Sequence, residues 1–237
     1  MKARLNRQLF TQRSFDSGAI GALESVVHQF SRPGSYVAEV RRNGDVRGSY
    51  TFVVAEQGNV QLDVDLTTVG GDEGGCDCHS SEEKNTLVTN GYVLFHASSG
   101  SGYSVLVGAV GEKGAEFNSE QLRDGDLFAL CLLEPTRYAL SDRLTTSTGE
   151  IDVTFSESDA KRIRNLETVY VDVGPDGFRP NRLDVVSTQG IVFRVKGKAR
   201  VLIEKSQPEK SQPKDRPAQR PRGSRKGVSR TKRQRRS

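Results

Sequence analysis

The stretch FDSGAIGALESVVHQFSRPGSY, residues 15–36, aligns without gaps on FNSEQLRDGDLFALCLLEPTRY, residues 117–138. The matched positions, 102 residues apart, are Phe15 with Phe117, Ser17 with Ser119, Ile20 with Leu122, Pro33 with Pro135 and Tyr36 with Tyr138. A second pairing joins LVTNGYVLF, residues 87–95, to VVSTQGIVF, residues 185–193. Similarity at a nearly fixed period indicates two copies of one structural unit. The alternative is a chance resemblance between common β-turn patterns.

The chain up to residue 205 consists mostly of short runs rich in Val, Tyr, Phe, Ile and Leu, separated by Gly, Asn, Asp and Ser. Typical runs are YTFVVAE at 50–56, YSVLVGAV at 103–110 and EIDVTF at 150–155. Many short strands at such spacing predict an all-β fold of sandwich or barrel type. Only SGAIGALESVVHQF, 17–30, and SESDAKRIRNLE, 156–167, have weak helical character.

The order of the repeated pieces predicts how the units are divided along the chain. Residues 57–156 would form a complete unit, residues 1–56 the C-terminal half of another unit, and residues 157–205 its N-terminal half. Half a sandwich cannot cover its own apolar face, so we expect 1–56 to pair with 157–205. The alternative is an exchange of half-units between two chains, which would give a homodimer.

The motifs at these turns resemble those of the cupredoxins, the blue-copper family. A Gly-led strand with an aromatic residue ends the first half of a cupredoxin, and GYVLF, 91–95, and GIVF, 190–193, are similar to it. A Pro-Gly-x-Tyr turn opens the second half. RPGSYVAEV, 32–40, matches this turn, and EPTRYALSD, 134–142, has Thr136 in place of the glycine. The resemblance implies tandem Greek-key β-sandwich units.

The copper ligands of that family are absent from this chain. A type 1 copper site needs two histidines and a cysteine, usually with a weak axial methionine. The resemblance places the first histidine position at Tyr103 and Ala199, and the cysteine position at Val40 and Asp142. The loops that would hold the second histidine contain none, and Met1 is the only methionine. The scaffold is therefore predicted without copper, electron transfer or another cofactor.

A second possible metal site lies in a loop rich in Gly, Asp and Ser. Cys76, Cys78 and His79 are close in sequence there, and two thiolates with an imidazole could hold Zn²⁺ or copper as Cu(I). The same pattern also fits incidental thiols in an exposed loop, or a strained disulfide or redox pair. Cys131, in the apolar run LFALCLL, is expected to pack in the core.

The charge of the chain is divided unevenly. The formal net charge is +5, but residues 206–237 hold 12 Lys and Arg against Glu209 and Asp215, a net of +10, which leaves −5 on residues 1–205. We call residues 206–237 the tail. The tail contains several prolines and no aromatic residue, so it cannot bury a core and is predicted to be disordered.

We expect the tail to bind a polyanion, with nucleic acid as the leading candidate, because a cationic segment neutralises phosphates without reading bases. The predicted phosphate contacts are Arg225, Lys226, Arg230, Lys232, Arg233, Arg235 and Arg236. An anionic membrane surface, an acidic protein or the absence of any specific partner are the alternatives.

The sequence contains no phosphate-binding loop, no nucleophile elbow and no zinc-protease helix motif. We therefore predict a non-enzymatic interaction protein, with a metal-handling protein as the alternative. No apolar run reaches the roughly 18 residues of a membrane span. The N-terminus MKARLNRQLFTQRSF lacks the apolar core of a signal peptide. We expect a cytoplasmic protein, unless the sequence begins downstream of an export signal.

Overall fold

The computed structural model describes residues 7–70, 85–155 and 166–206, which belong to one compact unit. These residues form one short 3-10 helix, sixteen strands and no α-helix, so the prediction of an all-β fold is confirmed for this part of the chain. The elements are η1 (Arg7–Phe10), β1 (Ser14–Asp16), β2 (Glu24–Phe30), β3 (Gly34–Arg42), β4 (Asp45–Ala55), β5 (Asn59–Asp65), β6 (Thr86–His96), β7 (Tyr103–Ala109), β8 (Phe117–Asn118), β9 (Leu127–Cys131), β10 (Arg137–Asp142), β11 (Thr148–Thr154), β12 (Val169–Gly174), β13 (Gly177–Arg179), β14 (Arg182–Val186), β15 (Gly190–Val195) and β16 (Val201–Lys205).

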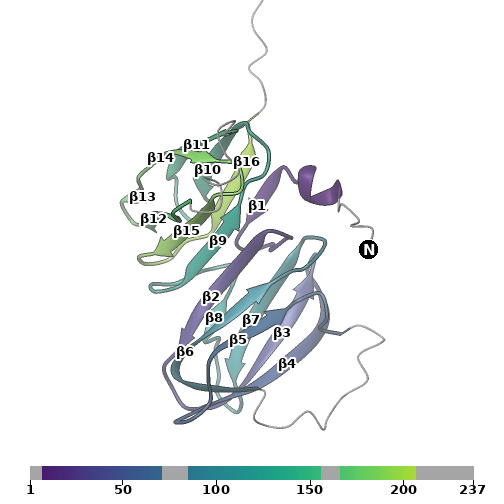
Figure 1. The fold of residues 1–237 in the computed structure, drawn as a ribbon. Coiled ribbons are helices and arrows are strands. Elements are labelled where there is room, and N and C mark those ends of the chain that lie inside the picture. Colours follow the sequence, from purple (N-terminus) through teal and green to yellow (C-terminus); the bar gives the residue numbers. More distant parts are fainter. Residues whose placement is uncertain (1–6, 71–84, 156–165, 207–237) are drawn as a thin grey trace, which may run out of the picture. The chain divides into compact units, whose positions relative to one another are not determined.

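The strands form two mixed sheets (Figure 1). The smaller sheet has five strands in the order β1-β16-β10-β11-β14. The larger has eleven, in the order β13-β12-β15-β9-β2-β6-β4-β3-β7-β8, with β5 paired to β6. Most described neighbours are antiparallel, whereas β4 and β5 run parallel to β6, β11 to β14, and β12 to β15. Burial alternates along strands such as β10 and β15, which places one side of each in the core.

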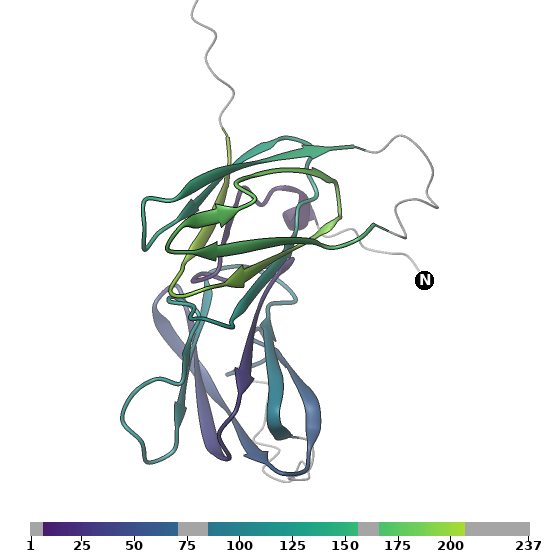
Figure 2. The same cartoon turned by 90° about the vertical axis from the view of Figure 1, so that its left-hand side faces the viewer.

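The strands gather in two groups, one around each copy of the repeat (Figures 1 and 2). Strands β3, β4, β6 and β7 belong to the first copy, and β10, β11, β14 and β16 occupy the matching places in the second. The first strand of each copy pairs with the other group: β1 pairs with β16, and β8 pairs with β7. The two copies therefore exchange one short strand reciprocally within a single chain.

Each exchanged strand inserts a phenylalanine into the core of the other group. Phe15 of β1 lies edge-on to Tyr138 of β10, with ring centroids 6.2 Å apart. Its counterpart Phe117 of β8 stacks on Phe95 of β6 at 5.6 Å. Burial of these rings stabilises the exchange, because each side chain removes a large apolar area from water.

Equivalent positions of the two copies make equivalent contacts, which confirms the predicted repeat. The bond from Ile20 N to Tyr103 O (2.6 Å) matches the bond from Leu122 N to Ala199 O (2.9 Å). The bond from Val201 N to Ser17 Oγ (3.2 Å) matches the bond from Val105 N to Ser119 Oγ (3.0 Å). The bond from Tyr36 Oη to Arg32 O (2.8 Å) matches the bond from Tyr138 Oη to Glu134 O (3.4 Å).

Strands β2 and β9 join the two groups into one sheet. They are antiparallel, and Val26 lies opposite Phe128 in their register. These two residues are also equivalent in the repeat, 102 positions apart. Equivalent residues that face each other across an antiparallel ladder lie on a two-fold axis, as in the isologous interface of a symmetric dimer. The two copies are thus related by a local pseudo-two-fold rotation.

The strand pairs divide the chain differently from the expected half-units. Residues 24–55 pair mainly with residues 59–109, whereas only β1 of the N-terminal segment pairs with the 157–205 segment. In place of separate Greek-key sandwiches, the larger sheet continues through both copies. An alignment shows which pieces are equivalent, but not which copy each piece pairs with. Exchange of half-units between two chains stays a prediction.

The weak helix candidate at 17–30 is not a helix. Residues 17–23 form turns and an isolated bridge, and Glu24–Phe30 form β2. Gly18 and Gly21 weaken a helix, and the β-branched Val26 and Val27 favour a strand that is buried on one side. Most of the second predicted helix, 156–167, lies outside the described residues.

Candidate functional site

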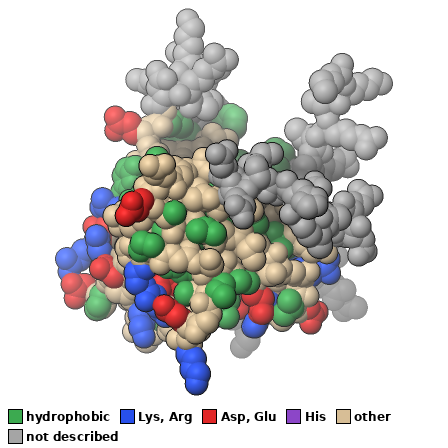
Figure 3. Space-filling model, turned by 90° about the horizontal axis from the view of Figure 1, so that it is seen from below, with side chains coloured by type: hydrophobic (Ala, Val, Ile, Leu, Met, Phe, Trp, Pro, Cys, Tyr) green, Lys and Arg blue, Asp and Glu red, His purple; other side chains and the backbone are tan. Residues whose placement is uncertain are grey.

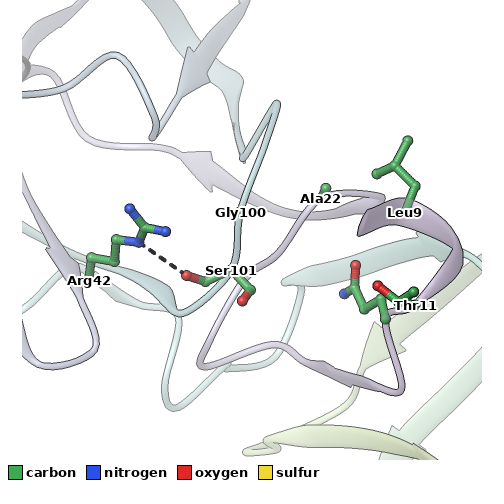
Figure 4. Close-up of a pocket in the computed structure, with 7 residues that line it drawn as sticks. Leu9, Thr11, Ala22, Arg42, Gly100 and Ser101 are labelled. Carbon is green, nitrogen blue, oxygen red and sulfur yellow. Dashed lines mark hydrogen bonds between the residues drawn. The ribbon is translucent and has the colours of Figure 1, made fainter. Parts of the chain in front are cut away.

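A hollow of about 340 Å³ lies where the N-terminal segment meets the end of β3 and the loop before β7 (Figure 4). Its lining residues are Leu9, Thr11, Gln12, Ala22, Arg42, Gly100 and Ser101. In Figure 4, Arg42 and Leu9 lie on opposite sides of this hollow. Four of the lining side chains can donate hydrogen bonds and none is acidic, so the lining favours a ligand that accepts hydrogen bonds. We call this hollow the Arg42 pocket.

The side chain of Arg42 is held in place by its own protein. Its guanidinium lies over the ring of Tyr103, 5.0 Å from the centroid. Its Nε donates to the carbonyl of Ser101 at 3.4 Å (Figure 4). Gly100 has a φ of +73°, and a Cβ there would lie 3.0 Å from Nη2 of Arg42. Glycine at this position therefore allows both the positive φ of the turn and the close approach of the guanidinium.

No ion pair with a carboxylate is described for Arg42 within the resolved ranges of the chain. The comparison with Arg194 is informative, because that guanidinium also lies over an aromatic ring, 5.3 Å from the centroid of Tyr170. Arg194 is neutralised by Asp172, whose Oδ1 accepts from Nε at 2.8 Å. The two arginines thus have similar aromatic supports, but the charge of Arg194 is balanced within the fold.

A buried carboxyl group lies beside the Arg42 pocket. A Cβ on Gly21 would lie 2.9 Å from Nε2 of Gln12, 3.0 Å from Oε2 of Glu24 and 3.2 Å from Cβ of Ser101, so these groups converge there. The amide of Gly21 donates to Oε2 of Glu24. Burial raises the pKa of Glu24 well above its usual value, although backbone hydrogen bonds oppose this shift. The carboxyl beside the pocket is therefore neutral more readily than an ordinary glutamate.

The counterpart of Glu24 in the second copy has a partner that Glu24 lacks. Asp126 accepts the amide of Arg123 at 2.6 Å through Oδ2, and its Oδ1 lies 2.6 Å from Nδ1 of His28. Across the pseudo-two-fold axis, Leu130 takes the position of His28 and lies opposite Glu24. Oε1 of Glu24 accordingly has no hydrogen-bond partner, and Nε2 of His28 has none either. The two copies therefore differ in their side-chain hydrogen bonds near the pseudo-two-fold axis.

A second, shallow hollow of about 360 Å³ lies on the face of the larger sheet where β6, β2, β9 and β15 adjoin. Its lining includes Leu94, Ala129, Cys131 and Val192. The expectation that Cys131 packs in the core is wrong, because Leu130 and Leu132 point into the core and alternation turns Cys131 to the opposite face. Burial raises the pKa of this half-buried thiol, so nothing here activates it as a nucleophile.

The residues predicted to bind metal or nucleic acid lie outside the described residues. This holds for Cys76, Cys78 and His79, and for the seven cationic tail residues Arg225, Lys226, Arg230, Lys232, Arg233, Arg235 and Arg236. Within the described ranges, no three His, Cys, Asp or Glu side chains are grouped as a metal site. In the same ranges, no helix has the length and apolar character needed to cross a bilayer.

The positions carried over from the copper family are structural in this fold. Val40 is buried in β3, and Tyr103 supports Arg42. Asp142 accepts the amides of Leu144 and Arg200 at 3.1 and 2.9 Å, which fixes the turn after β10. Comparisons with protein-family models, curated proteins and solved structures found no match for this chain. The resemblance to cupredoxins therefore stays a hypothesis.

The Arg42 pocket was not predicted from the sequence. Its only sequence signal is the run SSGSG at 98–102, a flexible turn that allows close backbone approach. From the sequence alone, Arg42 would be interpreted as a solvent-facing residue at the end of an alternating strand. Its contact with Ser101, 59 positions away, and the return of the N-terminal segment beside Ala22 are tertiary features. A single sequence carries no record of such contacts.

Proposed function

We propose that the chain is a non-enzymatic binding protein, in which the tail attaches the folded β-sheet part of residues 1–205 to nucleic acid. We call this part the body. The observation that carries this proposal is the division of charge, a net of +10 on residues 206–237 against −5 on residues 1–205. Counterions released from phosphates by such a segment supply the binding free energy, without contacts to bases. The cupredoxin resemblance enters only as a hypothesis about the origin of the scaffold.

The body supports this proposal because its net charge is negative and many of its arginines are in ion pairs. The arginines in ion pairs with carboxylates are Arg32, Arg41, Arg137, Arg179, Arg182, Arg194 and Arg200. Figure 3 shows one face of the molecule, on which acidic and basic side chains are interspersed. A polyanion would meet the unbalanced positive charge in the tail.

The composition of the tail favours nucleic acid over a membrane surface. Eight of its 12 cationic residues are arginines, whose planar guanidinium binds phosphate oxygens in a bidentate manner. A segment that binds bilayers usually also inserts aromatic or large aliphatic side chains. The tail has no aromatic residue, and Val228 is its only aliphatic residue larger than alanine.

The direct test is binding of the full-length protein to a fluorescent DNA duplex. A variant with the seven predicted contact residues replaced by glutamine should lose most of its affinity. A comparison variant changes the other five cationic residues of the tail, Lys210, Lys214, Arg216, Arg220 and Arg222, to glutamine. We expect a smaller loss of affinity per charge removed, because the distal charges are closer together. Equal affinity of wild type and the seven-residue variant would contradict the proposal.

A further inference from the structure

The Arg42 pocket has three properties that a binding site for a small ligand needs. Its volume of about 340 Å³ is at the lower end of the range for small-molecule sites. Its lining combines the apolar side chains of Leu9 and Ala22 with the polar side chains of Gln12 and Ser101. Its charged group, Arg42, is fixed by Tyr103 and Ser101 before binding. Such preorganisation lowers the entropy that a ligand must overcome.

We propose that the Arg42 pocket binds an oxyanion, the carboxylate or phosphate group of a small ligand. The guanidinium has a fork of N–H donors that matches two oxygens, and Nε is already occupied by the Ser101 carbonyl. Gln12 and Ser101 also line the hollow. Nε2 of Gln12 donates one of its two N–H groups to the carbonyl of Ser14 at 3.3 Å, which leaves the second for a ligand. Leu9 and Ala22 provide the contact surface for the apolar part of the ligand.

The surroundings of the pocket fit a negatively charged group. No acidic side chain lines it. The carboxyl of Glu24, which lies beside Gly21 and Ser101, is buried and accepts the amide of Gly21. Desolvation raises the pKa of Glu24, so it repels an oxyanion less than an ordinary exposed carboxylate would.

In the part of the chain that the structure describes, the pocket is present in only one of the two copies of the repeat. Continuing the offset of 102, Arg42 corresponds to Leu144, an exposed side chain that cannot bind an anion. The N-terminal residues Leu9, Thr11 and Gln12 complete the wall in the first copy only. A cationic pocket built on one of two equivalent places is a feature added to the scaffold, as expected for a binding site.

The test is an NMR titration of the ¹⁵N-labelled full-length protein at constant ionic strength, with inorganic phosphate in one series and acetate in another. We expect saturable shifts of the amides of Gln12, Gly100 and Ser101. The change Arg42→Gln should weaken binding about tenfold or more, as loss of charge-assisted hydrogen bonds does. Arg42→Lys should give an intermediate loss, because it keeps the charge without the fork.

The matched control is Arg47→Gln, which removes an equal charge from an exposed place on the next strand, β4. Saturation by phosphate alone or by acetate alone identifies the oxyanion, and either result supports the pocket. Shifts that do not saturate, or that are equal in the Arg42→Gln and Arg47→Gln proteins, would overturn the inference. The variant with the neutralised tail should keep these shifts while it loses DNA, so the two proposals can fail separately.

Discussion

Val26 of β2 lies opposite Phe128 of β9, and the two residues hold the same position in the two copies of the repeat. The pseudo-two-fold axis therefore passes between them. Because the first strand of each copy pairs with the other copy, the chain must cross between groups before β2 and again before β9. The first crossing brings the N-terminal segment beside Gly100 and Ser101, which forms the Arg42 pocket. The architecture thus explains the location of the site.

The strand exchange predicts that Phe15 and Phe117 contribute similarly to stability. Phe15→Ala and Phe117→Ala should each lower the free energy of unfolding by about 3–5 kcal/mol, the usual cost of truncating a buried phenylalanine. Urea unfolding measures this change. The control is Phe155→Ala, at a side chain that is 68% exposed, where we expect a change near zero. A negligible effect of Phe15→Ala would show that β1 is not part of the folded body.

Hydrogen exchange tests the same strand pairing locally. In the Phe15→Ala protein, the amides of Val201, Ile203 and Lys205 in β16 should exchange faster, because alternation turns these amides toward β1, as the bond from Lys205 N to the carbonyl of Arg13 shows. The amides of Leu202 and Glu204 face β10 and should keep more of their protection. Amides of β7 should keep their protection at the same urea concentration. Faster exchange spread evenly over both groups would instead indicate loss of global stability without specific undocking of β1.

The two tyrosine hydroxyl bonds should differ in strength. Tyr36 donates to the carbonyl of Arg32 at 2.8 Å, whereas the equivalent bond from Tyr138 to Glu134 is 3.4 Å long. We expect Tyr36→Phe to cost about 1 kcal/mol of unfolding free energy and Tyr138→Phe to cost less. Chemical denaturation of the two proteins under one condition decides this. A larger loss in Tyr138→Phe would contradict the geometry.

Glu24 predicts a specific pH dependence of stability. Its pKa is raised in the folded protein, mainly by burial, above the usual 4.5 of the unfolded chain. The folded state therefore binds the proton more tightly, and the free energy of unfolding falls as pH rises above 4.5, until the folded pKa is passed. Glu24→Gln should remove this part of the fall. If wild type and Glu24→Gln have parallel stability profiles, the carboxyl is not desolvated.

Asp126 is the natural control for this measurement, because it occupies the equivalent position with a partner. Asp126→Asn should lower stability at neutral pH by about 1–3 kcal/mol, since it weakens the contact with His28 and leaves buried polar atoms poorly paired. The two variants thus act differently although the residues are related by the repeat. A gain in stability from Asp126→Asn would contradict the role of the histidine.

The metal-handling alternative makes its own prediction. It requires one equivalent of Zn²⁺ or Cu(I) to bind the reduced protein, and binding to be lost in a Cys76→Ala/Cys78→Ala variant. We expect no stoichiometric uptake at these residues. A calorimetric titration of each metal into the reduced protein distinguishes the two hypotheses. Tight binding that depends on Cys76 and Cys78 would promote the alternative and would require His79 to be tested as the third ligand.

Local patterns predicted the strands and the repeat, because alternation and turn chemistry are properties of neighbouring residues. The partners of each piece were not predictable in this way. Phe15 and Phe117 read as equivalent side chains, but the sequence does not show that each enters the other copy. The same limit hid Arg42, whose function depends on a loop that is distant in sequence. Glu24 and Asp126 aligned with each other, yet only the fold shows that Asp126 alone has a hydrogen-bond partner in His28.

The measurement that tests the central claim most directly is the salt dependence of DNA binding by the full-length protein. Neutralisation of seven phosphates by the distal tail residues predicts a slope of roughly −6 for the logarithm of the affinity against that of the salt concentration. The slope should flatten clearly when the seven residues are changed to glutamine, and what remains should come from the other five cationic residues of the tail. Binding that is insensitive to salt, or a slope that the seven changes leave unaltered, would contradict the account.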